Sequence, residues 1–397
     1  MIPRSARLEL ERKLKQFPIV AILGARQVGK TTLARSARPG WTYVDVERPA
    51  QREPLLADPE DRLRNLGDQT ILDEAQLVPS VLEVLRGFVD EHPNKNGRYL
   101  LLGSASPLLM KNIAETLAGR VAFVELGSLT WEEVHASSLK ISIDNLWLRG
   151  GFPKAALVRD DQLRFDWFDA YSKTFIERDL PVMGVDVSVA QMRKLWAMLA
   201  HAQGTQWNAS RFGSALGMSY HTVNRYVDIL EHAFLIRRLP PFLPNLTKRL
   251  TKAPKIYLRD SGLLHYFTGA HSRERLDVNP GRGESWEGFV IEQLAAGIGR
   301  YALGAECFYF RTATGVEVDL VVQVGGRVTP FEIKTHTAPG IDAAIALRNF
   351  MRDMGCEKGY VIARSAADYS LGQGVTVLAA KKWLGNLPEL AKLVDAG

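Results

Sequence analysis

The feature that most constrains this chain is an octet near its N-terminus that fits the pattern G-x-x-x-x-G-K-[ST]. The apolar residues 18–23 before it predict a strand buried on both faces, and residues 32–35 after it are compatible with a helix. In such a loop, backbone N–H groups and the helix N-terminus converge on an anion. The expected phosphate contacts are Gly24, Ala25, Arg26, Gln27, Val28, Gly29, Lys30, Thr31 and Thr32.

Two side chains of the loop carry specific chemistry. Lys30 is expected to reach the β- and γ-phosphates of a nucleotide, and the Thr31 hydroxyl is expected to ligate Mg²⁺. ATP and Mg²⁺ are therefore the predicted cofactors. A chance match is the alternative, and the flanking strand and helix argue against it.

Composition bounds the class of protein. The chain has 397 residues, of which 46% are apolar, and this predicts two or three domains with proper cores. A net charge of +6 is a modest sign of a polyanionic partner. Two cysteines cannot build a disulfide framework. Residues 1–16 lack the apolar segment of a signal peptide, and no stretch has the length of a membrane span, so we expect a cytoplasmic protein without a membrane partner.

Four further apolar runs, separated by helix-compatible segments, predict a parallel sheet with covered faces. These runs are residues 43–46, 70–73, 98–103 and 121–126. Residues 70–73 lead into an acidic pair. Asp73 is placed to hold the Mg²⁺ shell, and Glu74 is placed to polarise the water that attacks the γ-phosphate. An exposed acidic strand end is the alternative.

Two more residues are candidates for catalysis. Ser104 follows the fourth strand, where a polar side chain would lie between the ends of the first and third strands and sense the γ-phosphate. An ordinary turn serine is the alternative. Arg120 immediately precedes the fifth strand, where an arginine can project into the nucleotide site of a neighbouring subunit. This role requires a homo-oligomer, whereas a surface arginine that caps a helix end does not.

By these motifs the chain resembles bacterial and archaeal AAA-type ATPases whose C-terminal half is catalogued as a domain of unknown function. The matching motifs are residues 24–33, 71–76 (I-L-D-E-A-Q) and 117–121 (L-A-G-R-V). The resemblance covers nearly the whole chain and implies a P-loop ATPase core over residues 1–130. It departs at residues 127–129 (G-S-L), where relatives more often carry a proline-containing turn, and no function is assigned there.

The middle of the chain predicts helices and a small DNA-binding fold. Residues 131–204 are expected to form a helical lid, with aromatic residues such as Phe168 and Phe175 in its core. Residues 205–270 predict two short helices and a basic hairpin, which together make a winged helix-turn-helix. The likeness to the family continues here.

DNA is the partner that this predicted winged helix would contact. The residues expected on the exposed face of its second helix are Tyr220, His221, Asn224 and Arg225. The loop of the hairpin adds the basic residues Lys248, Arg249 and Lys252. Winged helices also serve as packing modules, so a protein partner is the alternative.

Residues 280–397 predict an α/β domain with a tight hairpin. Two glycines at 325–326 form a two-residue turn that fixes the register of the flanking strands. Asp319 then lies opposite Glu332. Glu317 lies opposite Lys334 on the same face of the sheet.

Directly opposed carboxylates are destabilising without a compensating cation, and a divalent metal is the obvious one. Lys334, diagonal to Asp319, can position or activate a water. Glu287 on an upstream helix can supply a third carboxylate, with Glu292 as the alternative.

An acid on a helix, an Asp on one strand and Glu-x-Lys on the next form the pattern of PD-(D/E)xK nucleases, and relatives of the family carry such a domain. The alternative is a plain Glu317–Lys334 salt bridge with Asp319 solvated. Pro330 is a second concern, because it lacks an N–H and can introduce a bulge that breaks the register.

The predicted fold class is therefore α/β: a P-loop AAA-type parallel sheet, then a helical lid and winged helix, then a nuclease-like domain. The predicted function is Mg²⁺-dependent ATP hydrolysis that couples nucleotide state to a DNA-related or regulatory action of the C-terminal domains. One rival is an NTP-dependent binding switch with an inert nuclease-like domain. A second is a small-molecule kinase, against which Glu74 beside Asp73 argues.

Overall fold

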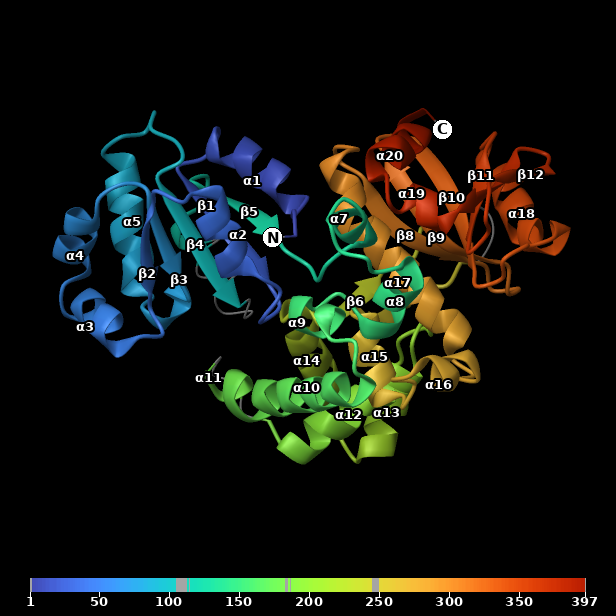
Figure 1. The fold of residues 1–397 in the computed structure, drawn as a ribbon, viewed down its shortest axis with the longest axis horizontal. Helices are drawn as coiled ribbons and strands as arrows, with labels where there is room; N and C mark the ends of the chain where they lie inside the picture. The colour runs from blue at the N-terminus through green and yellow to red at the C-terminus, as the bar shows by residue number, and fades with distance from the viewer. Residues whose placement is uncertain are drawn as a thin grey trace. The chain divides into compact units, whose positions relative to one another are not determined.

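The computed structural model describes residues 2–104, 113, 115–182, 185, 187–244 and 250–396. The chain forms two compact units (Figure 1). The N-terminal unit comprises Arg4–Ser128 and His232–Phe234; the C-terminal unit comprises Met1–Pro3, Leu129–Glu231 and Leu235–Gly397. Among the described residues, no helix combines the length and apolarity needed to cross a membrane.

The N-terminal unit is built on a five-stranded parallel sheet in the order β2-β3-β4-β1-β5 (Figure 1). Its strands are β1 (Ile19–Gly24), β2 (Thr42–Asp45), β3 (Thr70–Asp73), β4 (Tyr99–Ser104) and β5 (Val121–Glu125). Each lies within one residue of the strand predicted from the sequence. Every residue of β1 is buried, as expected for a strand covered on both faces.

The strand order determines which loops meet. Because β4 lies between β1 and β3, the carboxyl ends of these three parallel strands share one edge of the sheet. At this edge Gly24 pairs with Ser104, and Asp73 pairs with Leu102. The glycine loop after β1, the acidic pair after β3 and the end of β4 are thereby brought together.

Helices and one apolar core complete the N-terminal unit. The helices are α1 (Ala6–Leu14), α2 (Lys30–Ala37), α3 (Pro49–Ala57), α4 (Pro59–Leu66), the 3₁₀ turn η1 (Ala75–Leu77) and α5 (Ser80–Asp90). Buried side chains of α3, α4 and α5 pack with those of β1, β3 and β4. This core holds the strand ends in place.

The C-terminal unit begins with helices. They are α7 (Trp131–His135), α8 (Ile143–Arg149), α9 (Pro153–Leu157), α10 (Asp161–Thr174), the π-helical η2 (Phe175–Asp179), α11 (Leu180–Val182) and α12 (Val189–His201). Phe168 and Phe175 are buried, and Phe168 packs edge-on against Phe152. The aromatic residues are therefore core, as predicted, while a role of this segment as a lid stays a prediction.

Two helices and a two-stranded sheet follow. They are α13 (Ala209–Leu216), α14 (Tyr220–His232), β6 (Ile236–Leu239) and β7 (Lys255–Leu258), with β6 and β7 antiparallel. Ser219 caps α14 by accepting a hydrogen bond from the Thr222 N–H at 3.1 Å, as expected for a serine at an N-cap. Val223, Val227 and Leu230 of α14 are fully buried, as their helical spacing predicts.

The last part of the unit is a six-stranded mixed sheet in the order β12-β13-β11-β10-β9-β8. Its strands are β8 (Glu306–Arg311), β9 (Glu317–Val324), β10 (Arg327–Lys334), β11 (Gly359–Ala363), β12 (Tyr369–Gly372) and β13 (Val375–Ala379). The predicted register is confirmed from the Val324–Arg327 pair to the Leu320–Phe331 pair. Pro330 pairs with Val321 within this ladder and introduces no shift.

Helices cover both faces of this sheet (Figure 1). The remaining helical elements are α15 (Ser261–Phe267), α16 (Arg273–Asp277), α17 (Arg282–Gly297), η3 (Ile298–Arg300), η4 (Ile341–Ala344), α18 (Ile345–Met354), α19 (Ala380–Trp383) and α20 (Leu387–Ala396). Leu320 and Val322 share a core with α17 and α20, whereas Val321 and Val361 share a second core with α18.

Candidate functional site

The loop between β1 and α2 has the conformation of a phosphate cradle. Gly29 has φ of 100°, in the left-handed region that favours glycine. Gly24 tolerates no side chain, because a Cβ there would lie 2.1 Å from the carbonyl oxygen of Leu126. Lys30 begins α2, and its Nζ donates to the carbonyl oxygens of Gly24 and Ala25 at 3.0 Å each. The ammonium group therefore lies within the loop, where phosphates are expected.

The other predicted contacts of the loop differ in their surroundings. Ala25 is buried, Gln27 has a left-handed backbone with φ of 64°, and Thr32 is exposed. Arg26 forms an ion pair with Glu47 at 3.1 Å. Their contact with phosphate stays a prediction.

Arg4 fastens this loop, and sequence reasoning missed it. One nitrogen of its guanidinium, Nη1, donates to the carbonyl oxygen of Val28 at 2.7 Å. The other, Nη2, donates to the carbonyl oxygen of Gly127, also at 2.7 Å. Arg4 thus ties the loop to the segment after β5, for which the sequence alone predicted no function. No local motif contains Arg4, so only the fold identifies it.

The two residues expected to hold Mg²⁺ are in direct contact. Thr31 Oγ1 donates to Asp73 Oδ2 at 2.6 Å, and the Tyr43 hydroxyl donates to the same oxygen at 2.8 Å. Burial raises the pKa of Asp73, and the hydrogen bonds from Thr31 and Tyr43 oppose this shift. A divalent cation beside the carboxylate would favour its ionised form. A hydroxyl and a carboxylate are oxygen ligands of the kind that Mg²⁺ takes, so this pair fits the ion.

Glu74 has a strained backbone beside this pair. Its φ is 57° and its ψ is 45°, a conformation that residues other than glycine rarely adopt. Its carboxylate accepts a hydrogen bond from the Gln76 side-chain amide. Strained residues of this kind cluster at functional sites, and Glu74 follows directly on Asp73 at the loop edge of the sheet.

Ser104 lies at the carboxyl ends of the strands, and Arg120 lies at their amino ends. Ser104 ends β4 at the loop edge, and its side chain lies outside the described residues. The Arg120 carbonyl accepts a hydrogen bond from the Ile19 N–H, at the start of β1 and so about 20 Å from the loop by strand length. The Arg120 guanidinium donates to both carboxylate oxygens of Asp90, at 2.6 and 2.9 Å. Within one subunit Arg120 is therefore remote from the phosphate loop.

The predicted DNA-contacting residues lie on α14. Three of the four are exposed: Tyr220, His221 and Arg225. Asn224 is half-buried, and its Oδ1 accepts a hydrogen bond from the Trp207 indole N–H at 2.9 Å. Residues 248–249 of the basic hairpin loop lie outside the described residues.

The acidic residues predicted in the C-terminal sheet form a buried cluster. Asp319 and Glu332 are each only 8% exposed. Burial, followed by the charges of Glu287 and Glu332, raises the pKa of Asp319 well above its usual range. Asp319 Oδ2 accepts the Ile333 N–H at 2.8 Å, and Lys334 Nζ donates to Glu332 Oε1 at 2.6 Å. Glu287, Asp319, Glu332 and Lys334 are thus brought together by α17, β9 and β10.

Lys255 of β7 belongs to this cluster, and sequence reasoning missed it. Its side chain is almost fully buried, and its Nζ lies 3.0 Å from Glu287 Oε1. It also forms an ion pair with Glu317. Burial alone would lower the pKa of Lys255, but the charges of Glu287, Asp319 and Glu317 raise it, so this lysine stays charged. The sequence does contain one sign of this role: Lys255 is a charged residue directly before the apolar residues of a buried strand, where a lysine needs an acidic partner.

Glu287 and Glu317 are both held by protein groups. The Tyr257 hydroxyl donates to the same Glu287 oxygen at 2.5 Å. Glu317 pairs with Arg311 at 2.6 Å in addition to Lys255. The predicted alternative of a Glu317–Lys334 salt bridge is wrong, because Glu317 faces Lys255 and Arg311 instead.

Glu292, the alternative third acid, belongs to a different network. It is buried and pairs with Arg237 at 2.7 Å and with Arg259 at 2.6 Å. Within the described part of the chain, no three His, Cys, Asp or Glu side chains are arranged to hold a metal ion. Metal binding by Glu287, Asp319 and Glu332 therefore stays a prediction that this arrangement does not favour.

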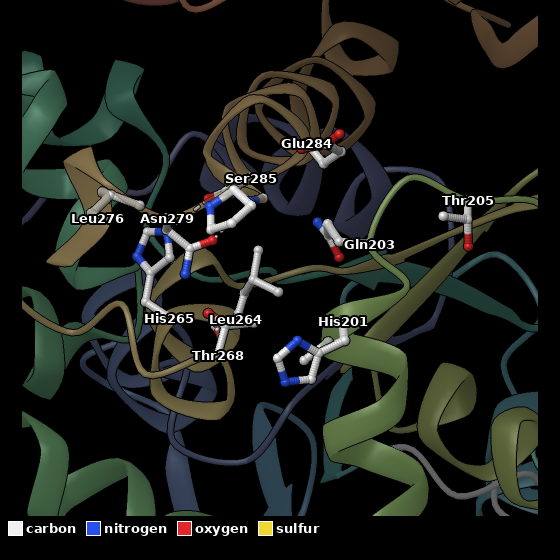
Figure 2. Close-up of a pocket in the computed structure, with 13 residues that line it drawn as sticks. His201, Gln203, Thr205, Leu264, His265, Thr268, Leu276, Asn279, Glu284 and Ser285 are labelled. Atoms are coloured by element: carbon white, nitrogen blue, oxygen red, sulfur yellow. Dashed lines mark hydrogen bonds between the residues drawn. The ribbon is translucent and has the colours of Figure 1, made fainter. Parts of the chain in front are cut away.

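A pocket of about 520 Å³ lies elsewhere in the C-terminal unit (Figure 2). It is lined by the end of α12, by α15 and by the first turn of α17, and its size is typical of small-molecule sites. On its wall His265 Nε2 lies 2.7 Å from Ser285 Oγ, and His265 Nδ1 lies 2.9 Å from the Leu148 carbonyl oxygen. Since a carbonyl only accepts, Nδ1 carries the proton and Ser285 donates to Nε2.

Acid should destabilise the chain through His265. Burial lowers the pKa of His265 to about 4, so the folded form holds it neutral while the unfolded chain takes up a proton. The free energy of unfolding should therefore fall as pH drops from about 6.5 to about 4, by up to roughly 3 kcal/mol. Urea unfolding at several pH values should show a shallower fall for His265→Gln, which does not titrate. Equal pH dependence in both proteins would contradict this assignment.

Three family models match the chain in succession. Residues 16–135 match an AAA domain, residues 140–274 match a domain of unknown function (DUF8612), and residues 282–383 match another domain of unknown function (DUF4143). The first match and the loop geometry agree, so this part of the chain is an AAA-type P-loop domain of the kind found in ATP-binding NTPases.

Relatives extend over the full length. The uncharacterised proteins Rv2008c of Mycobacterium tuberculosis and Mb2031c of Mycobacterium bovis are each 39% identical over 396 residues, which cover 98% of this chain and 87% of theirs. Among solved structures, the Walker-type ATPase paby2304 of Pyrococcus abyssi is similar, with a TM-score of 0.48 and 16% identity over 67% of this chain and 96% of that one. By its 39% identity to Rv2008c and Mb2031c over nearly its whole length, the chain belongs to the protein family that includes these two proteins.

Proposed function

We propose that this protein is a Mg²⁺-dependent ATP hydrolase whose nucleotide state controls a DNA-related or regulatory action of its C-terminal unit. The observation that carries this proposal is the hydrogen bond from Thr31 to Asp73 next to a lysine held inside the loop. Lys30 and Thr31 begin α2, and Asp73 ends β3. ATP hydrolases need these groups together.

Each group has a role in the proposed reaction. Lys30 balances charge on the β- and γ-phosphates, and the N–H groups at the start of α2 orient them. Glu74 orients the attacking water in line with the bond that breaks. Mg²⁺, when held by Thr31 and Asp73, neutralises phosphate charge.

A matched pair of variants tests these roles. Lys30→Ala should abolish nucleotide binding or turnover, because the loop loses its phosphate-facing charge. Glu74→Gln should retain ATP but slow hydrolysis by roughly 100-fold, since only the water-orienting group is lost. Nucleotide binding and phosphate release should be measured together. The control is Glu83→Gln, an exposed position on α5 that should behave like the wild type.

The same assay separates the proposal from its rivals. Wild-type turnover by Glu74→Gln would contradict the assignment of this residue. Phosphate release without an added acceptor excludes a small-molecule kinase. Tight binding with no turnover in the wild type would leave an NTP-dependent switch as the better description.

Arg120 is proposed to act across a subunit boundary, because it lies at the edge of the sheet away from its own phosphate loop. Its ion pair with Asp90 is exposed and worth little on its own. The guanidinium can therefore be exchanged to another partner at small cost. This role requires self-association.

Mixing two inactive variants tests this role. Lys30→Ala lacks a working loop but retains Arg120, and Arg120→Ala has the reverse defect. Mixed oligomers should regain part of the ATP hydrolysis that each variant lacks alone, measured as phosphate release against mixing ratio. Absence of rescue, with both proteins folded and associated, would leave Arg120 a structural residue.

The C-terminal unit is proposed to carry out the action that the nucleotide state controls. The succession α13, α14, β6 and β7 supports a winged helix-turn-helix. Its exposed Tyr220 and Arg225 are proposed to meet DNA, with a protein partner as the alternative. A second candidate function, a binding switch with an inert nuclease-like domain, is favoured by the position of Lys255 in the acidic cluster.

A further inference from the structure

We propose that Lys255 is the internal counter-ion of the acidic cluster in the C-terminal sheet and takes the place of a divalent metal, so this domain acts without metal-dependent cleavage. The inference rests on the proposed description of the domain as nuclease-like. It concerns the C-terminal unit alone and leaves the ATP site unaffected.

Protein charges neutralise most of the cluster. Its carboxylates belong to Glu287, Glu317, Asp319 and Glu332, and its cations to Lys255, Lys334 and Arg311. Three of the four carboxylates have an ion pair with one of these cations, and the fourth, Asp319, accepts a backbone N–H at 2.8 Å. Four carboxylates face three cations, so most of the repulsion that made a metal the expected partner is compensated within the chain.

The position of Lys255 is determined by the fold. It pairs with Leu239 in the β6–β7 ladder, and its ammonium lies 5.6 Å from the ring centroid of Tyr309. The Tyr257 side chain, two residues further along β7, lies on the same face and donates to the same Glu287 oxygen. Its burial and its ion pairs with Glu287 and Glu317 hold the ammonium in the cluster.

The consequence for metal binding is direct. Glu287 corresponds to the helix acid of the nuclease pattern, and its oxygen is already shared by Lys255 and Tyr257. A divalent ion between Asp319 and Glu332 would face a buried ammonium that is paired with Glu287 and Glu317, and like charges in a poorly solvated site repel strongly. Glu332 keeps one buried oxygen, Oε2, without a hydrogen-bond partner, but Glu287 is already bound by Lys255 and Tyr257, so the cluster offers fewer free ligands than its residue types suggest.

The charge-removing variant Lys255→Met tests this inference in the full-length chain without nucleotide. The wild type should show no rise in melting temperature in Mn²⁺ over chelator that Asp319→Asn abolishes, at matched ionic strength. Lys255→Met should melt lower in chelator and regain about 5 °C or more in Mn²⁺, because the ion then replaces the lost cation. Lys255→Arg keeps the charge and should stay insensitive to Mn²⁺. The matched surface control is Lys382→Met, whose side chain is 64% exposed.

Each other outcome overturns the proposal. A rise in the wild-type melting temperature with Mn²⁺ that Asp319→Asn abolishes would establish a metal site beside Lys255. Stability of Lys255→Met equal to the wild type in both conditions would remove Lys255 as counter-ion. Mn²⁺-dependent cleavage of plasmid DNA by the wild type, lost in Asp319→Asn, would show that the domain is a nuclease.

A double variant keeps the proposal testable if Lys255→Met alone does not fold. If Lys255→Met does not fold in chelator or in Mn²⁺, Lys255→Met with Glu287→Gln removes both members of the central ion pair. Recovery of folding would support the counter-ion role, and continued failure would overturn it. ATP hydrolysis assayed on the same proteins reports separately on the N-terminal unit, so the two proposals fail independently.

Discussion

The insertion of β4 between β1 and β3 is the constraint on which the nucleotide site depends. Parallel strands place their carboxyl ends at one edge, and this order brings the glycine loop and the acidic pair to the same edge. The hydrogen bond of 2.6 Å between Thr31 and Asp73 joins residues 42 positions apart and follows from that arrangement. Arg4 then fastens the loop to the chain after β5. Lys30 is thereby held where a phosphate would bind.

The two units differ in how they treat buried charge. In the N-terminal unit, the buried Asp73 accepts hydrogen bonds from two hydroxyl groups, and burial raises its pKa while the charge of the buried Lys30 lowers it. In the C-terminal unit, buried carboxylates are paired with lysines that the fold supplies.

The sequence predicts what local patterns determine, and little else. The strands of the N-terminal sheet follow from continuous apolar runs, and the register of β9 and β10 follows from the two glycines at 325–326. Lys255 could not be placed, because its contact with Glu287 spans 32 residues and no periodic pattern states which strand faces α17. Arg4 was missed for the same reason, because it lies 123 positions before its partner Gly127. Long-range pairing of charges is what the fold adds.

The central claim is that Thr31 and Asp73 form the Mg²⁺ site of an ATP-binding loop. The most direct test is the affinity for ATP with and without Mg²⁺, measured for the wild type and for Asp73→Asn, which keeps the shape and the hydrogen-bond acceptor. We predict that Mg²⁺ tightens ATP binding to the wild type by about tenfold or more, equivalent to roughly 1.4 kcal/mol, and that Asp73→Asn loses this gain. The same Mg²⁺ dependence in both proteins would contradict the account.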